Sequence, residues 1–106
     1  MKYSIKFSAQ AGRDLDRTWD EVLETSKSLA VTTKYIDDLL DKIESKSEFP
    51  LSGSPLYYEE LFTGYRFITF KVYLVFYHVE GNEILVDRIL YGKSDYIRRL
   101  KLKDQD

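Results

Sequence analysis

The chain has 106 residues, of which 43% are hydrophobic and 15% aromatic. This composition indicates one packed globular domain over residues 1–106, because a chain of this length buries one core but not two. Sixteen basic and 18 acidic side chains give a net charge of −2, which argues against broad non-specific binding to phosphate backbones. The lack of cysteine excludes disulfides, thiolate metal sites and a cysteine nucleophile.

No targeting, membrane or cofactor signal accompanies this domain. The N-terminal residues contain no long apolar run or small-residue cleavage site, and 18 consecutive apolar residues occur nowhere. There is one histidine, no glycine-rich phosphate loop and no paired-histidine motif. We therefore expect a cytoplasmic protein that has no membrane contact, no metal and no cofactor.

The N-terminal half predicts a short strand and a helical hairpin. Residues 3–7 alternate apolar and polar side chains, as a half-buried strand does. Ser8 can cap a helix that runs to about Ser28, with an apolar stripe of Ala11, Leu15, Trp19 and Val22. A second amphipathic helix is predicted from Leu29 to Lys46, and we expect the two helices to pair antiparallel.

The C-terminal half predicts a β-meander. Proline and glycine in residues 49–55 indicate a loop. Strands rich in Val, Ile, Tyr and Phe follow at residues 65–70, 73–79 and 83–91, with a shorter one possible at 57–62. Residues 94–103 have the spacing of a short basic helix. The fold class is thus α+β, in the order strand, helix, helix, three or four strands, with the hairpin packed on an antiparallel sheet. Both faces of the strands carry apolar residues, so we expect the second face to be partly covered or to bind a partner.

Two arginines interrupt the apolar strands. Each must reach solvent, pair with a carboxylate or bind a phosphate or a partner. Glu59 or Glu60 is a candidate ion-pair partner for Arg66, and Asp95 is one for Arg88. A structural ion pair and a binding role are equally compatible with the pattern, because a guanidinium suits both.

Other candidates are His78 and the basic tail. His78 can act as an acid or base near neutral pH, although a lone strand histidine more often has a structural hydrogen bond. The tail carries a local charge of +4 from Lys93, Arg98, Arg99, Lys101 and Lys103 against Asp95. It could hold phosphates, with Tyr91 and Tyr96 stacking on bases, or it could be a solvated helix.

Several segments resemble the RelE/ParE toxin superfamily. They are residues 64–66, 73–79 and 84–92 in the meander, and residues 15–19 on the first helix. With Phe49-Pro50 closing the second helix, the resemblance covers most of the chain. It implies a toxin of a type II toxin–antitoxin system, bound by a cognate antitoxin whose C-terminal region wraps it. It also implies one of two activities: RelE-like members cut mRNA on the ribosome, and ParE-like members poison DNA gyrase.

The resemblance is closer to ParE. Leu74 stands where RelE has an arginine, Ser94 replaces a further arginine, and Leu100 stands near the functional C-terminal tyrosine of RelE. Arg66 and Arg88 match positions of ParE-like sequences. The resemblance thus implies a gyrase inhibitor, with a ribosome-dependent mRNA endoribonuclease as the alternative.

Site residues follow from this resemblance as expectations. Target binding would involve Arg66, Arg88, Lys93, Arg98 and Arg99. In the RelE-like alternative, the catalytic residues would be Arg66, Lys93, Tyr96 and Arg98. Antitoxin binding, in a toxin–antitoxin hetero-oligomer, would involve Trp19, Leu23, Ile36 and Leu40.

Overall fold

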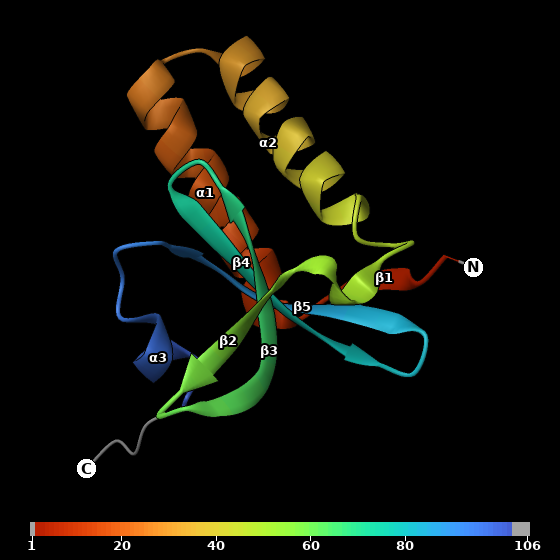
Figure 1. Cartoon of the computed structure of the whole chain (residues 1–106). Coiled ribbons are helices and arrows are strands. Elements are labelled where there is room, and N and C mark those ends of the chain that lie inside the picture. Colours follow the sequence, from red (N-terminus) through yellow and green to blue (C-terminus); the bar gives the residue numbers. More distant parts are fainter. Residues whose placement is uncertain (1, 103–106) are drawn as a thin grey trace.

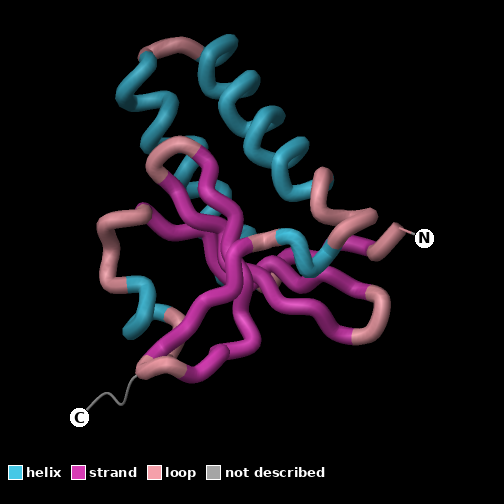
Figure 2. Tube along the Cα trace, viewed as in Figure 1, coloured by secondary structure: helices cyan, strands magenta, loops and turns pink. Residues whose placement is uncertain are grey.

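A computed structural model describes residues 2–102 of the chain as two long helices packed on a five-stranded sheet (Figure 1). Figure 2 shows the helical hairpin on one side of the twisted strands, and the short C-terminal helix apart from it. The elements are β1 Ser4–Phe7, α1 Ala9–Ser26, α2 Leu29–Glu44, the 3₁₀ turn η1 Pro50–Ser52, β2 Ser54–Tyr58, β3 Leu61–Phe70, β4 Tyr73–Glu80, β5 Glu83–Tyr91 and α3 Tyr96–Arg99. No helix within the described residues is long and apolar enough to span a membrane.

Serine caps start both long helices. The Ser8 hydroxyl accepts the Ala11 backbone N–H at 2.9 Å, and the Ser28 hydroxyl accepts that of Val31 at 3.2 Å. Each cap satisfies one of the backbone donors that a helix start leaves unpaired. Between the helices, Lys27 adopts a left-handed conformation with φ 58° and reverses the chain. The predicted antiparallel hairpin is confirmed, and α1 starts directly after Ser8 as expected.

The strand order is β1-β5-β4-β3-β2. Strands β2 to β5 form the expected antiparallel meander. The expectation of a wholly antiparallel sheet is wrong at one edge, because β1 pairs parallel with β5, with Ser4 opposite Glu83 and Phe7 opposite Val86. The helical hairpin and strands β2 to β4 together form the long connection between these two parallel strands.

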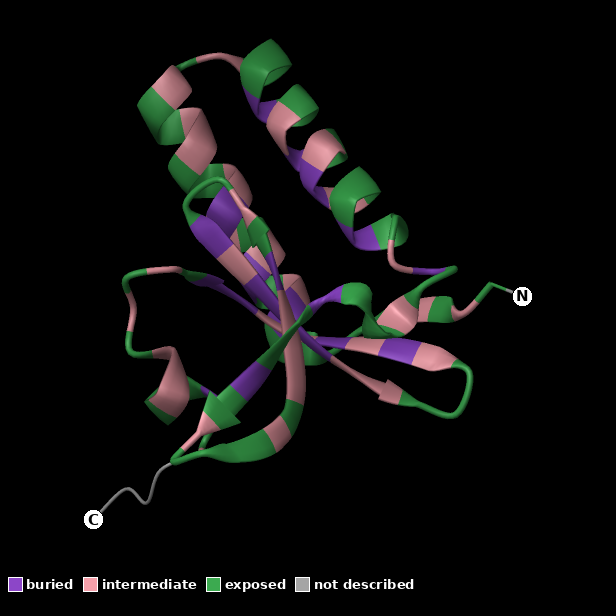
Figure 3. Ribbon diagram, in the orientation of Figure 1, coloured by how far each residue is buried: buried purple, intermediate pink, exposed green. Residues whose placement is uncertain are grey.

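Apolar residues bury on both faces of the sheet. The helix-facing cluster includes Leu39, Val75 and Val86, and Figure 3 shows the buried stripe of the hairpin facing the sheet. The opposite face is covered by the chain after β5, in a cluster of Leu56, Phe76, Leu90 and Leu100. Each such fully buried side chain contributes about 1.5–3 kcal/mol through removal from water. The expectation of a partly covered second face is confirmed.

Two predicted elements differ from the structure. The strand expected at 57–62 is interrupted, because Glu59 and Glu60 form the turn between β2 and β3. The helix expected at 94–103 is one turn long, ends at Arg99 and is followed by Lys101 with φ 60°. The end of that expected helix at Lys103 lies outside the described residues.

Candidate functional site

Arg88 forms an ion pair with the buried carboxylate of Asp14 on α1. Asp14 is 2% exposed, and its Oδ2 lies 2.7 Å from Arg88 Nε, while its Oδ1 lies 3.1 Å from Arg88 Nη2. Asp14 Oδ2 also accepts the Ile89 backbone N–H at 2.9 Å, and Oδ1 accepts Arg17 Nη1 at 3.0 Å. The partner expected from sequence, Asp95, is therefore wrong, and the ion pair joins α1 to β5.

The pKa values of this pair follow from its contacts. Burial by itself would raise the pKa of Asp14, but the hydrogen bonds from Arg88 and Ile89 outweigh it and hold the pKa below its usual value. The hydrogen bond to Asp14 raises the pKa of Arg88. Both groups therefore stay charged, and the pair is a structural clamp whatever else Arg88 binds.

Arg66 holds a loop instead of a carboxylate. Its Nη1 donates to the carbonyl oxygens of Leu51 at 3.1 Å and Gly53 at 3.2 Å, so the expected pairing with Glu59 or Glu60 is wrong. The neighbouring Tyr77 hydroxyl donates to the Pro50 carbonyl oxygen at 2.7 Å and accepts the Gly53 N–H at 3.0 Å. Together these contacts fix the η1 segment against β3 and β4.

The described part of the basic tail, up to Leu102, packs on the second face of the sheet through Leu100. Arg98 Nε is 3.4 Å from Asp95 Oδ2, and the Tyr96 ring packs on Phe76 with centroids 5.2 Å apart. Lys93 and Arg99 are exposed. A cavity of about 270 Å³ has Arg88 and Arg99 in its wall, so two residues expected to bind the target lie together there.

A histidine–carboxylate pair lies on the sheet face opposite the helices. His78 Nδ1 is 2.6 Å from Asp87 Oδ2, and the Tyr65 ring meets the His78 ring edge to face with centroids 6.0 Å apart. Burial raises the pKa of Asp87, although the hydrogen bond to His78 opposes this shift. His78 therefore has the hydrogen-bond partner that a lone strand histidine usually has.

The residues expected to bind the antitoxin lie mainly under the helical hairpin. Ile36 is 8% exposed and belongs to the core, and Trp19 and Leu40 pack partly buried against the same cluster. Leu23 is half-buried. Ile36 therefore offers little surface to a partner. Apolar side chains that are open to solvent lie elsewhere on the molecule.

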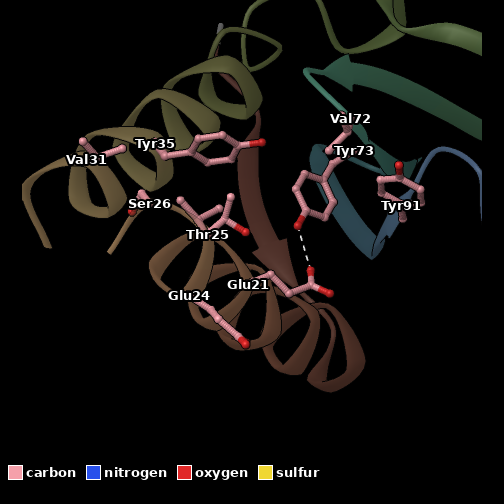
Figure 4. Close-up of a pocket in the computed structure, with 10 residues that line it drawn as sticks. Glu21, Glu24, Thr25, Ser26, Val31, Tyr35, Val72, Tyr73 and Tyr91 are labelled. Atoms are coloured by element: carbon pink, nitrogen blue, oxygen red, sulfur yellow. Dashed lines mark hydrogen bonds between the residues drawn. The ribbon is translucent and has the colours of Figure 1, made fainter. Parts of the chain in front are cut away.

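An open groove separates the tip of the helical hairpin from the β3–β4 turn. Figure 4 shows its walls: Glu21 and Thr25 from α1, Val31 and Tyr35 from α2, Val72 from the β3–β4 turn, and Tyr73 and Tyr91 from strands β4 and β5. Its volume is about 560 Å³, larger than that of the cavity beside Arg88 and Arg99. The Tyr73 hydroxyl donates to Glu21 Oε1 at 2.7 Å (Figure 4). Burial, followed by this hydrogen bond, raises the pKa of Tyr73 strongly.

A second apolar surface follows the β2–β3 edge. Leu61 is 72% exposed and Tyr57 58% exposed, although both lie in strands. The Tyr57 and Phe62 rings lie 5.8 Å apart, and the Arg66 guanidinium lies over the Phe62 ring at 5.4 Å. Neither this surface nor the groove was predicted, because each depends on how distant segments meet. The one sequence signal for the β2–β3 surface was the presence of the aromatic residues Tyr57 and Phe62 so close together in the chain.

The sequence matches the model of the ParE toxin of type II toxin–antitoxin systems over residues 5–96. The chain belongs to the ParE toxin family. The matched residues include the Asp14–Arg88 clamp, the tyrosines of the groove and the start of α3. No curated protein matches the chain in sequence.

Solved structures share the ParE-family fold. A chain of the chromosomal ParDE toxin–antitoxin system of P. aeruginosa is 21% identical, with a TM-score of 0.72, covering 87% of this chain and 98% of that one. A chain of the RelBE2 toxin–antitoxin complex of Mycobacterium tuberculosis is 18% identical, with a TM-score of 0.61, over 86% and 99%. YafQ of E. coli strain BL21(DE3) is 15% identical, with a TM-score of 0.51, over 85% and 93%. At these identities the likeness establishes the fold alone.

Proposed function

We propose that this ParE-family chain is a toxin that a cognate antitoxin binds and neutralises, and that it acts by inhibiting DNA gyrase. The family match over residues 5–96 is the observation that carries the proposal. The open apolar groove and the exposed β2–β3 edge support a protein partner, because monomeric proteins rarely leave such surfaces uncovered.

The arrangement of the candidate nuclease residues favours gyrase over mRNA. Arg66 is opposite Tyr77 in the β3–β4 register, and Tyr77 belongs to the helix-facing core. Tyr96 packs on Phe76, in the cluster on the other face. Side chains that are opposite each other in register share a face of the sheet, so Arg66 and Tyr96 point to different faces. A single scissile phosphate between them would require rearrangement.

The test of the target is a supercoiling assay with purified gyrase and toxin freed of antitoxin. We expect loss of supercoiling or accumulation of cleaved DNA. Because exposed charges at the edge of an interface tune association, replacing Lys93, Arg98 and Arg99 by alanine should weaken inhibition about tenfold. Replacing Lys34 and Lys42, two exposed lysines of α2, is the matched control and should leave inhibition unchanged. Normal supercoiling at stoichiometric excess of folded toxin would overturn the gyrase proposal.

One observation favours the ribonuclease alternative. The carboxylate of Asp87 holds the His78 ring through Nδ1, which is how an imidazole is oriented for general-base catalysis. In that case, translating ribosomes incubated with the toxin should yield codon-positioned mRNA cuts. His78→Gln should abolish the cuts, while gyrase activity in the same extract stays normal.

A further inference from the structure

We propose that the groove between the hairpin tip and the β3–β4 turn is a receptor for one basic side chain, arginine in preference to lysine, of the antitoxin. We call it the tyrosine groove and define it by Tyr35, Tyr73, Tyr91, Glu21 and Glu24. The inference rests on the proposed antitoxin partner for the identity of the occupant. The cation-binding chemistry rests on the groove itself.

Aromatic rings form one side of the tyrosine groove. The Tyr35 and Tyr73 rings lie 6.4 Å apart at 85°, and the Tyr73 and Tyr91 rings lie 6.4 Å apart at 81°. Such edge-to-face rings present π faces in different directions, and a π face attracts a cation within about 6 Å of its centroid. Tyr91 is 44% exposed and Val72 is 53% exposed, so this side is accessible to a partner.

The neighbouring Lys71 shows that these rings accept a cation. Its Nζ lies 5.6 Å from the centroid of Tyr35 and 5.5 Å from that of Phe70. Lys71 comes from the β3–β4 turn at the margin of the groove and is not among the residues that line it. The fold therefore already places an ammonium group on one ring of the set. Tyr73 is only 5% exposed, so Tyr91, which is 44% exposed, offers the accessible ring face for a second cation.

The negative charge of the tyrosine groove also favours a cationic occupant. Of the ten residues lining the groove, two are acidic, Glu21 and Glu24, and none is Lys or Arg. The Glu21 carboxylate is held by the Tyr73 hydroxyl through Oε1, and a carboxylate has about four lone-pair positions to offer donors. A purely apolar occupant would take this carboxylate out of water without a new partner, at a cost in free energy. A guanidinium can stack on tyrosine and hydrogen-bond to carboxylate at once, which a lysine ammonium does less well.

The direct test uses a small probe and the full chain. N-acetyl-L-arginine amide is titrated in an NMR experiment, with N-acetyl-L-citrulline amide as the uncharged probe of nearly the same shape. We expect saturable shifts at the tyrosine groove, with about tenfold tighter binding of the arginine probe than of the citrulline probe. Equal binding of both probes, or no shifts at the groove with the arginine probe, would overturn the proposal.

Variants assign the effect to named groups. Glu21→Gln keeps an acceptor for the Tyr73 hydroxyl and removes the charge, so it should reduce the preference for the arginine probe several-fold without changing the melting temperature. Glu44→Gln removes an exposed acid at the far end of α2 and should leave the preference intact. An arginine preference that is unchanged in Glu21→Gln would contradict the role of the carboxylate.

A second measurement identifies the occupant. The antitoxin encoded beside this chain is purified as a complex, and each of its arginines is changed to glutamine. One of these changes should weaken the complex about tenfold and be non-additive with Glu21→Gln in a double-mutant cycle. Additive effects for every arginine would exclude the antitoxin as occupant. The probe titration needs neither antitoxin nor gyrase, so failure of the proposed function and failure of the groove are separate results.

Discussion

At the scale of single residues, Asp14 organises more of the molecule than any arginine that the sequence singled out. Its two oxygens receive donors from Arg17, Arg88 and the Ile89 backbone. These groups come from α1 and β5, so one carboxylate fixes how the helical hairpin lies on the sheet. Arg88 thereby stabilises the folded state, and any loss of toxicity on its removal must be separated from loss of stability.

We expect Asp14→Asn to lower the free energy of unfolding by about 3 kcal/mol near pH 7, because it leaves the Arg88 charge without its partner in a largely buried setting. The Arg88 side chain is 15% exposed. Urea denaturation followed by circular dichroism measures this loss. Asp38→Asn is the control, since it breaks an exposed pair with Lys34 on α2 and should cost less than about 0.5 kcal/mol. A loss below about 1 kcal/mol in Asp14→Asn would contradict the clamp.

At the scale of elements, the β2–β3 hairpin is built on an unfavourable turn. Glu59 has φ 51° and Glu60 has φ 68°, so both central residues of the two-residue turn are left-handed. Such turns favour Asn-Gly, because side chains other than Gly and Asn are strained there. The β4–β5 turn, in contrast, has Gly81 at φ 58°.

Replacing Glu59 by Asn and Glu60 by Gly should therefore stabilise the chain by about 1 kcal/mol. Thermal unfolding monitored by circular dichroism measures the change. The reciprocal variant, Gly81→Ala, introduces a side chain at a left-handed position with open space around it, and should destabilise by a similar amount. If the double variant were less stable than the parent, contacts of Glu59 or Glu60 would outweigh the relief of strain.

At the scale of the whole molecule, the buried carboxylate of Asp14 and the half-buried carboxylate of Asp87 contribute to the pH dependence of stability with opposite signs. The folded state lowers the pKa of Asp14, so the stability from this group is present above its unfolded value, about 4, and is lost as pH falls further. The folded state raises the pKa of Asp87, so the stability from that group is present below about pH 4 and is lost as pH rises through the folded pKa.

Unfolding free energies measured in urea from about pH 3 to pH 7 test both signs. Asp14→Asn should flatten the decline on the acid side, and Asp87→Asn should flatten the decline above about pH 4. An Asp87→Asn profile that falls as steeply as the parent above that pH would show that Asp87 is not the group responsible.

Sequence patterns predicted most of the fold because its elements are amphipathic. The stripe on α1, the Ser8 cap and the apolar strands all carry a period that local reasoning can detect. The parallel β1–β5 pair is different, since no local period specifies which strand is the neighbour of another. The C-terminal helix was predicted too long. Tyr96 and Leu100 pack on the second face of the sheet, and the left-handed conformation of Lys101 directly after them prevents the helix from continuing.

The candidate site was harder to predict for the same reason. Arg88 and Asp14 are 74 residues apart in the chain. Arg66 binds backbone carbonyl groups, and because every residue has one, the residue types do not indicate which carbonyl groups it binds. The tyrosine groove requires α1, α2 and the β3–β4 turn to meet. The sequence did identify Arg88 and Arg99, which share a cavity wall. Their part in target binding stays a prediction.

The parallel pairing of β1 with β5 has a consequence for how a newly synthesised chain folds. Ser4 pairs with Glu83, so β1 remains unpaired during synthesis until both helices and three further strands have been made. During that interval the hairpin has no β5 to cover its apolar face, and contacts so distant in sequence form slowly. The β1–β5 pair and the Asp14–Arg88 clamp are therefore among the last contacts that a newly synthesised chain can form.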